Sequence, residues 1–410
     1  MRRAFICLLI IVANILGKPE DGDEINVDER RVTQEAEIID TLLNGYNPKV
    51  RPIGNVLYEG FHRPVVITVS MHIISLKRVD DIKMEYDLQL FLRQKWRDDR
   101  LAYAKEGPDA VTLRDNQKIW TPDTFFGNEA EAHRHMLDQP NTLIHIHRDG
   151  SVFYSTRLSM TLFCPMDFVK LPFDTQRCNF IIESYAYTED DIVYIWDNEI
   201  AIKYDSNYMT SLPLFEISNI TSEGKSVRVK ERTYSNIQAI FHLRRKLGYY
   251  FYHFYLPTTM LVITSWTAFF LHPSKATARM FIGLGSLALL TLFSALFNRD
   301  VPKTSYAKAL DVWSGTIFLF VFLSLIESVL ISYLHSAQHE CCDALISDPE
   351  EQLITPASKW NARKRRKSLI CRIYDLFRGQ TRKMDVLSRL VFPAMFAIFT
   401  LIYFTVWWVL

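Results

Sequence analysis

Cys164 and Cys178 are the residues with the clearest capacity for chemistry in this sequence. They are the only two cysteines between the N-terminal hydrophobic stretch and the first long apolar segment. In an oxidising compartment such a pair persists as a disulfide, and closing a loop of this length stabilises a fold by roughly 3 kcal/mol. We therefore expect the two to pair. A lone structural disulfide in an otherwise ordinary exported domain is the competing interpretation.

Export is predicted by residues 1–17, in which two arginines precede a short apolar run typical of a secretory signal peptide. An N-terminal membrane anchor is the alternative, although the run is shorter than the ~20 residues that a span needs. Metal-ligand clusters of strong spacing, phosphate loops and nucleophile elbows are not evident, so the sequence predicts no enzyme, metal site or cofactor. The net charge of +1 gives no reason to expect a nucleic-acid partner.

Residues 18–246 read as short strands in which apolar and polar side chains alternate. In residues 84–92 the even-numbered positions form an apolar face, which leaves Phe91 and Arg93 on the polar face. Asp149-Gly150 predicts a hairpin turn, and the strand after it points Ser155 and Arg157 outward. We predict an extracellular antiparallel β-sandwich.

Four apolar segments follow, at residues 249–271, 280–297, 312–333 and 390–410, each long enough for a helix across hydrocarbon. They divide the remaining chain into transmembrane helices 1–3 (247–334), a cytoplasmic loop with an amphipathic helix (335–384) and transmembrane helix 4 (385–410). Basic residues 363–367 in the long loop agree with the positive-inside rule. The apolar tip of the 164–178 loop precedes these spans, and we expect it to be buried at the membrane.

The second span differs from the others because it is rich in Gly, Ala, Ser and Thr and is flanked by Arg279 and Arg299. Small and hydroxyl side chains in a span serve either tight helix packing or a water-facing stripe. One helix cannot enclose water, so a pore of this kind requires an oligomer.

The Cys-x13-Cys spacing, with Pro165 after the first cysteine and Leu-Pro-Phe-Asp inside, resembles the signature loop of the Cys-loop receptors, the pentameric ligand-gated ion channels. The likeness covers roughly residues 35–410 and includes four membrane segments in the family's order. It implies a β-sandwich ectodomain, a four-helix membrane domain, assembly into a homo- or heteropentamer, and a multi-pass protein of a synaptic or neuromuscular plasma membrane.

The same resemblance implies a transmitter site between neighbouring subunits. Its principal face would use Phe125, Glu183, Ser184, Tyr185 and Tyr234, and its complementary face Phe91, Arg93, Ser155 and Arg157. Aromatic rings and one carboxylate hold a cationic amine, while arginine binds an agonist carboxylate through forked hydrogen bonds. On spacing alone, a solvated ion pair explains the two arginines equally well.

By resemblance, Thr277-Ala278-Arg279 corresponds to the Pro-Ala-Arg that precedes the pore helix of anion-selective members, with Ala278 where cation channels carry Glu. Arg279 is then expected as a cationic ring at the inner mouth, which favours anions. By the same resemblance, the lumen would also receive the side chains of Phe281, Gly285, Ala288, Leu292, Leu296 or Ala295, and Arg299. Ala288 occupies the mid-pore position where the family usually has leucine. A gate that closes by excluding water would then have to form at Leu292 or Leu296.

Two further expectations concern the ectodomain. Asp174 is predicted to pair with Arg245 and to couple the ectodomain to the membrane domain, against the alternative of a weak surface pair. Asn219 lies in a glycosylation sequon.

The sequence thus predicts a chloride-selective channel subunit opened by GABA or a biogenic amine. A cation-conducting or auxiliary subunit and a membrane-anchored binding protein without a pore remain as alternatives.

Overall fold

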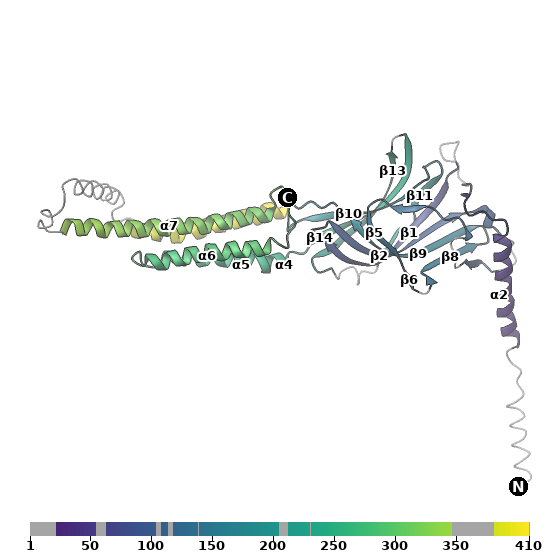
Figure 1. Cartoon of the computed structure of the whole chain (residues 1–410), viewed down its shortest axis with the longest axis horizontal. Coiled ribbons are helices and arrows are strands. Elements are labelled where there is room, and N and C mark those ends of the chain that lie inside the picture. Colours follow the sequence, from purple (N-terminus) through teal and green to yellow (C-terminus); the bar gives the residue numbers. More distant parts are fainter. Residues whose placement is uncertain are drawn as a thin grey trace, which may run out of the picture.

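The computed structural model describes residues 22–54, 63–103, 108–113, 118–137, 139–204, 212–229, 231–346 and 381–409. The expected signal peptide (1–17) and nearly all of the cytoplasmic loop after residue 346, with its amphipathic helix, lie outside these residues. The described chain is elongated, with a β-rich ectodomain at one end and a bundle of long helices at the other (Figure 1).

Two sheets form the ectodomain. The larger has the strand order β11-β1-β2-β9-β8-β3, with β12 added beside β1 and β5 beside β9, and the smaller has the order β13-β14-β10-β4. The strands of the larger sheet are β1 (Val65–Asp80), β2 (Glu85–Arg97), β3 (Ala110–Leu113), β5 (Glu129–Arg134), β8 (Thr142–His147), β9 (Ser151–Phe163), β11 (Ile192–Trp196) and β12 (Ile202–Tyr204). Those of the smaller sheet are β4 (Thr124–Phe126), β10 (Thr175–Ser184), β13 (Phe215–Val229) and β14 (Arg232–Arg245). A separate short hairpin joins β6 (Met136–Leu137) to β7 (Gln139–Pro140).

The predicted sandwich is confirmed, and its pairs are antiparallel except that β11 and β12 each run parallel to β1. The alternation of apolar and polar residues matches which side chains are buried, as expected. Tyr86, Leu88, Leu90 and Leu92 are buried, and the neighbouring strand β9 buries its own even-numbered residues. Gly150 supplies the predicted hairpin turn with a φ of +80°, where a side chain would also collide with the Asp98 carbonyl.

One ectodomain element was not predicted. Residues Gly22–Leu43 form helix α2 at the end of the molecule farthest from the membrane helices (Figure 1). Its last turns place Ile39, Leu42 and Leu43 against the sandwich core. This three-and-four spacing is helical rather than strand-like, so the signal was present in the sequence. A short helical turn, η1 (Asp99–Leu101), follows β2.

The membrane domain follows β14 directly. Its elements are α4 (Gly248–Tyr250), η3 (Phe251–Tyr255), α5 (Leu256–Trp266), η4 (Thr267–Phe270), α6 (Ala276–Phe297), α7 (Ala309–Ile346) and α9 (Thr381–Val409). Within the described residues, α6, α7 and α9 are long and apolar enough to cross a membrane. The expected first span is helical from α4 to η4 but divided, with a wide turn just before Pro257. Proline has no N–H for the helical hydrogen bond at that point, which explains the interruption.

Many aromatic side chains of the spans point into the bundle rather than to its outside. Trp313 of α7 donates to Thr258 Oγ1 of α5 at 3.1 Å and packs on Tyr403 of α9. The hydroxyls of Tyr255 and Tyr403 lie 2.8 Å apart, and Tyr403 donates to the Ala309 carbonyl. Aromatic packing with satisfied polar ends therefore holds the outer half of the bundle together.

Candidate functional site: two ectodomain faces, a junction and a pore helix

An aromatic and acidic group of residues lies on the outer face of the smaller sheet. Glu183 of β10 pairs in register with Phe125 of β4 on one side and with Asn236 of β14 on the other. The Phe125 ring stands edge-on to Tyr185 with centroids 5.6 Å apart. Continuing the β10–β14 register by two residues sets the half-exposed Tyr234 opposite Tyr185, which is 78% exposed. Four of the five predicted principal-face residues therefore lie together.

Hydrogen bonding and a neighbouring glycine hold the Glu183 carboxylate in place on this face. Its Oε2 accepts a hydrogen bond from the Asn236 amide at 3.1 Å. A Cβ at Gly127 would lie 2.8 Å from Glu183 Oε1, so the glycine leaves room for the carboxylate. The carboxylate is thus fixed beside the Phe125 and Tyr185 rings, an arrangement that attracts a cation.

Ser184, the fifth predicted residue, does not share this face. It is 3% exposed, and its hydroxyl donates to Asp123 Oδ1 at 2.6 Å. The other Asp123 oxygen accepts from the Ala186 amide at 2.7 Å. Ser184 therefore shapes the loop instead of meeting a ligand, and Asp123 is the residue that fixes this loop. Asp123 belongs to the Trp120-Thr121-Pro122-Asp123 motif, so its position in that motif could have identified it from the sequence.

A second group, with two arginines, lies on the outer face of the larger sheet. Strand register places Phe91 opposite Arg157 and Arg93 opposite Ser155. All four are half-exposed. The Arg157 Nε has no hydrogen-bond partner among the described residues. The structure therefore brings the four complementary-face residues together, on a different sheet from Glu183 and Phe125.

The junction between ectodomain and membrane helices is organised by Arg245, the last residue of β14. Its Nε and Nη2 donate to the two oxygens of Asp174 at 2.7 and 2.9 Å, and Nη1 donates to Asp81 and to the Tyr250 hydroxyl. The guanidinium also lies 4.4 Å from the Phe215 ring centroid. The predicted pair is confirmed and buried, so the surface-pair alternative is wrong. Burial alone would lower the Arg245 pKa, but the Asp174 hydrogen bonds and charge raise it.

Asp81, in the turn between β1 and β2, was missed by the sequence analysis. Burial raises its pKa against the opposing effect of Arg245, and its Oδ1 has no partner among the described residues. A carboxylate in such a turn looks like an ordinary surface residue until the fold places Arg245 beside it.

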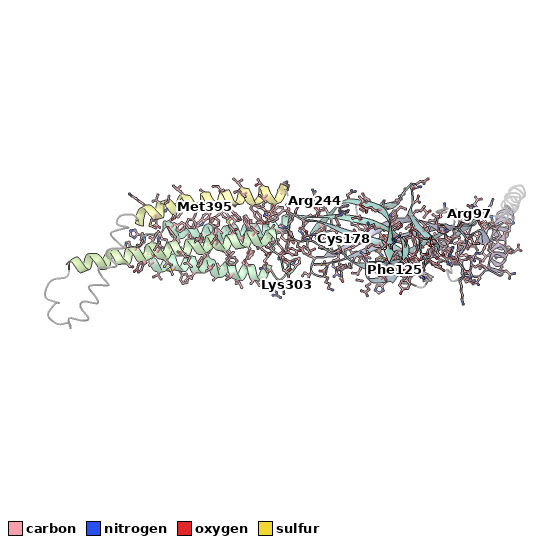
Figure 2. All side chains as sticks on the ribbon, turned by 90° about the horizontal axis from the view of Figure 1, so that it is seen from above. Arg97, Phe125, Cys178, Arg244, Lys303 and Met395 are labelled. Atoms are coloured by element: carbon pink, nitrogen blue, oxygen red, sulfur yellow. A yellow bond between two sulfur atoms is a disulfide. The ribbon has the colours of Figure 1, made fainter. Side chains whose placement is uncertain are left out.

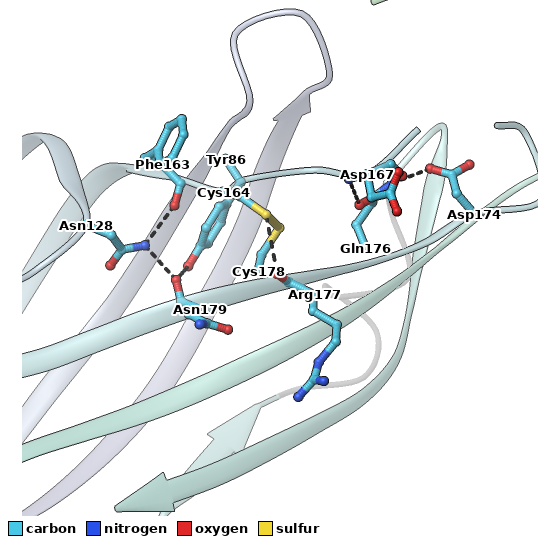
Figure 3. The surroundings of a disulfide bond; sticks show 10 residues. All are labelled: Tyr86, Asn128, Phe163, Cys164, Asp167, Asp174, Gln176, Arg177, Cys178 and Asn179. Carbon is cyan, nitrogen blue, oxygen red and sulfur yellow. Dashed lines mark hydrogen bonds between the residues drawn. A yellow bond between two sulfur atoms is a disulfide. The ribbon is translucent and has the colours of Figure 1, made fainter. Parts of the chain in front are cut away.

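The expected disulfide joins Cys164 and Cys178 (Figure 3). Beside it, the Gln176 amide donates to the Asp167 carbonyl and to Asp174 Oδ2, each at 2.6 Å, which fixes the loop and orients Asp174 (Figure 3). The disulfide therefore closes the loop that presents Asp174 to Arg245.

The tip of this loop is buried against the protein itself. Phe168 and Leu171 are fully buried, and the Phe168 amide donates to the Tyr306 hydroxyl. The carbonyls of Val169 and Leu171 accept from the amides that begin α7, at 2.9 and 3.1 Å. The loop tip thus packs against the α6–α7 linker and the start of α7. We had expected the tip to be buried at the membrane instead.

Helix α6 has two distinct faces. Gly283, Ser286 and Ser294 are buried against the other helices, and a Cβ at Gly283 would collide with Leu325 of α7. The opposite face is exposed in the single chain and contains five of the eight predicted pore residues, which are Ala278, Phe281, Ala288, Leu292 and Leu296; a sixth, Arg299, is exposed just after the helix ends. Gly285 is half-exposed beside them. Small residues therefore allow close packing on one face of this helix, and the exposed face is the candidate for the predicted water-facing stripe.

Arg279 does not lie on the exposed face of α6. The expectation that its side chain forms a cationic ring at the inner mouth is therefore wrong. Arg279 is 0% exposed. Its Nη1 and Nη2 donate to the two oxygens of Asp385 in α9 at 3.0 and 2.7 Å, and Nη2 also donates to the Leu271 carbonyl. Residue 279 lies on the packed face of α6, one position from Ala278 on the exposed face, so the side chain turns into the bundle.

The sequon residue Asn219 is exposed on β13. Within the described residues, no three His, Cys, Asp or Glu side chains gather into a metal site.

The chain has a β-sandwich with exposed aromatic and charged side chains, and a buried arginine joins this sandwich to a bundle of membrane helices. This combination is that of a membrane receptor with an extracellular domain. Residues 35–247 match the family model described as neurotransmitter-gated ion-channel ligand binding domain, and residues 254–345 match the neurotransmitter-gated ion-channel transmembrane region. The chain belongs to the neurotransmitter-gated ion-channel family, whose members are channels and not enzymes.

Curated relatives agree with this assignment. The chain is 38% identical over 310 residues to the glutamate-gated chloride channel subunit beta of Haemonchus contortus, covering 74% of this chain and 72% of that one. It is 29% identical over 420 residues to the glutamate-gated chloride channel of Drosophila melanogaster, covering 91% of each. It is 37% identical over 304 residues to the glycine receptor subunit beta of Rattus norvegicus, covering 72% of this chain and 60% of that one.

The junction yields a prediction about stability. Arg245→Gln or Asp174→Asn leaves a buried charge without its main partner, at a cost of about 3–5 kcal/mol, so we expect loss of surface expression. Asp81→Asn removes one hydrogen bond from a half-satisfied carboxylate, and we expect a smaller effect of about 1 kcal/mol. Surface biotinylation and thermal unfolding of the purified variants check this order. Equal damage from Asp81→Asn and Asp174→Asn would contradict it.

The buried position of Arg279 yields a second prediction. Arg279→Asp and Asp385→Arg should each lower surface expression, and the double exchange should restore part of it because the pair can form in reverse. Channels with the exchanged pair should keep the wild-type ion selectivity, since neither side chain faces the lumen. The check is the reversal potential under a chloride gradient. A shift toward cation selectivity would show that residue 279 faces the ion path after all.

Proposed function

We propose that the chain is a subunit of a pentameric, chloride-selective channel opened by an amino-acid transmitter bound between neighbouring subunits. The observation that carries this proposal is the division of the candidate site between two sheets. The rings and carboxylate lie on the smaller sheet, and the two arginines lie on the larger. Each half is incomplete in one chain, and a second copy that apposes its larger sheet to the first copy's smaller sheet completes the site.

The chemistry of the two halves suits a zwitterion. Glu183 with Phe125 and Tyr185 attracts an ammonium group, and Arg93 or Arg157 can bind a carboxylate with two parallel hydrogen bonds. Both arginine side chains are partly exposed on this face, which supports this role. Glutamate and glycine, named in the relatives' descriptions, are amino acids, as is GABA. A biogenic amine would use the first half alone.

Anion selectivity needs a source other than the Arg279 side chain. Residues 271–279 contain no carboxylate but include Lys275, which lies exposed before the start of α6. The α6 N-terminus has no side-chain cap from Lys275, and the N-terminal end of a helix carries a partial positive charge. Five such ends around an axis, next to the uncharged Ala278, would attract anions at the inner mouth.

A second candidate function is an auxiliary subunit of a heteropentamer. Phe281 is 81% exposed on the proposed lumen face, and five phenylalanine rings at one level would narrow the path. One or two such subunits among partners with smaller side chains would leave the path open. Lack of current from the chain alone, with current on co-expression with a related subunit, would favour this candidate.

The ligand proposal predicts the effect of arginine variants. In oocytes we expect glutamate, glycine or GABA to open the channel. Arg93→Gln or Arg157→Gln should raise the half-maximal concentration about tenfold or more through the loss of a charged hydrogen bond. The matched control is Lys95→Gln, on the same face of β2, with little change. An agonist amine whose potency ignores both arginine variants would contradict the amino-acid proposal.

The selectivity proposal predicts a charge effect at Ala278. Wild-type currents should reverse near the chloride equilibrium potential. Ala278→Glu would place five carboxylates on the exposed face at the α6 N-terminus, so we expect reversal toward cation selectivity. Ala278→Gln, of the same size and without charge, should keep chloride selectivity. Chloride selectivity that survives Ala278→Glu would place the selectivity filter elsewhere.

A further inference from the structure

Two histidines from separate segments meet at the cytoplasmic end of the helix bundle. His272 lies in the turn between η4 and α6, and His335 lies near the inner end of the membrane-crossing part of α7, which is Ala309–Ser336. Their ring centroids are 5.9 Å apart, with an interplanar angle of 82°. Figure 2 shows Lys303, which follows α6 in the chain, at the ectodomain end of the helices, so the turn that precedes α6 lies at the opposite end. The pair is therefore remote from both the transmitter site and the junction.

The backbones that carry the two rings are fixed, while the rings can be reached by an ion. The turn is closed by the Lys275 amide, which donates to the His272 carbonyl at 2.9 Å, and His335 belongs to a regular helix. In the single chain His272 is exposed and His335 is half-exposed. An ion that enters from the cytoplasm would therefore meet two imidazoles that are already close together.

Ser274 orients the His272 ring. Its hydroxyl lies 2.8 Å from His272 Nδ1, and its backbone amide lies 3.2 Å from the same nitrogen. In one tautomer Nδ1 accepts from the amide. In the other, Nδ1–H donates to the hydroxyl, and the lone pair of Nε2 is then free for a metal ion. A hydrogen bond from the opposite ring nitrogen accompanies most metal-binding histidines and fixes the ring.

The separation of the two rings suits a transition-metal ion. Zn–N bonds are about 2.0–2.1 Å long, so two imidazoles bound to one ion have centroids about 5–6 Å apart. Imidazole nitrogens suit Zn²⁺ and Cu²⁺, whereas Ca²⁺ and Mg²⁺ prefer oxygen ligands. The exposed Lys275 beside the turn repels any cation, so the affinity must come from the nitrogen ligands and not from surface charge.

From this geometry we propose that His272 and His335 bind a divalent transition-metal ion, with Zn²⁺ as its probe, at the cytoplasmic face. One nitrogen of each ring would bind the ion, and water would fill the remaining coordination positions. The bound ion would tie the turn that leads into α6 to the end of α7. Neither a transmitter nor an open pore is needed for this binding.

Protection from diethyl pyrocarbonate, which modifies free imidazole nitrogens, tests the site in the purified full-length protein. We expect Zn²⁺ to slow the modification of His272 and His335 severalfold, as measured by mass spectrometry of their peptides. Both should be protected over the same range of Zn²⁺ concentration, because one ion binds both rings. Ca²⁺ at that concentration should protect neither. The half-exposed His242 of β14 is the internal control, and its modification should not change.

Variants separate a shared site from two independent histidines. His335→Ala should remove the protection of His272, and His272→Ala should remove that of His335. Ser274→Ala should require about tenfold more Zn²⁺ for the same protection, because the hydrogen bond that orients His272 is lost. Lys275→Gln, the matched control in the same turn, should keep the protection.

Two results would overturn the proposal. One is modification of both wild-type histidines at an unchanged rate in Zn²⁺, which would reduce the pair to a ring contact. The other is protection of His272 that persists in His335→Ala. Because no agonist or current enters the measurement, a failure of the channel proposal would leave these results unaffected.

Discussion

One guanidinium joins the two halves of this molecule. Arg245 ends the last strand of the ectodomain, and it is buried among groups from the β1–β2 turn, the disulfide loop and the first membrane helix. A buried arginine is tolerated only where carboxylates and hydrogen-bond acceptors surround it. Every segment that meets at the junction is therefore fixed relative to Arg245, and movement of either domain must displace at least one of its partners.

The disulfide loop shows how a covalent bond and a polar contact act together. The bond closes the loop, Gln176 orients Asp174 within it, and the tip binds the start of α7 through backbone hydrogen bonds. The loop thus contacts Arg245 on one side and the linker after the proposed pore helix on the other. The coupling that we propose would therefore run from the ectodomain sheets through this loop to the start of α7.

Sequence reasoning predicted what depends on local pattern or on a strong motif. Alternation in β2 and β9 identified the outward residues Phe91 and Arg157, and pairing register then explains why they meet. The family motif identified Asp174 and Arg245. It did not reveal Asp81, Asp123 or Asp385, because each acts through a partner far away in the sequence or through a loop shape. Arg279 was expected at the inner mouth because Thr277-Ala278-Arg279 resembles a family motif, and that motif does not reveal a carboxylate 106 residues away.

The last helix is fastened at both ends while much of its length is exposed. Near its start, Asp385 neutralises Arg279 and Arg389 donates to the Phe269 carbonyl, and near its end Tyr403 joins Tyr255. During biosynthesis the ribosome completes this helix after all the others. Until it arrives, Arg279 remains an uncompensated cation at the edge of the hydrocarbon, which is costly. The start of α6 therefore depends on a helix that is synthesised later, and a chain that stops before residue 385 leaves Arg279 without its carboxylate partner.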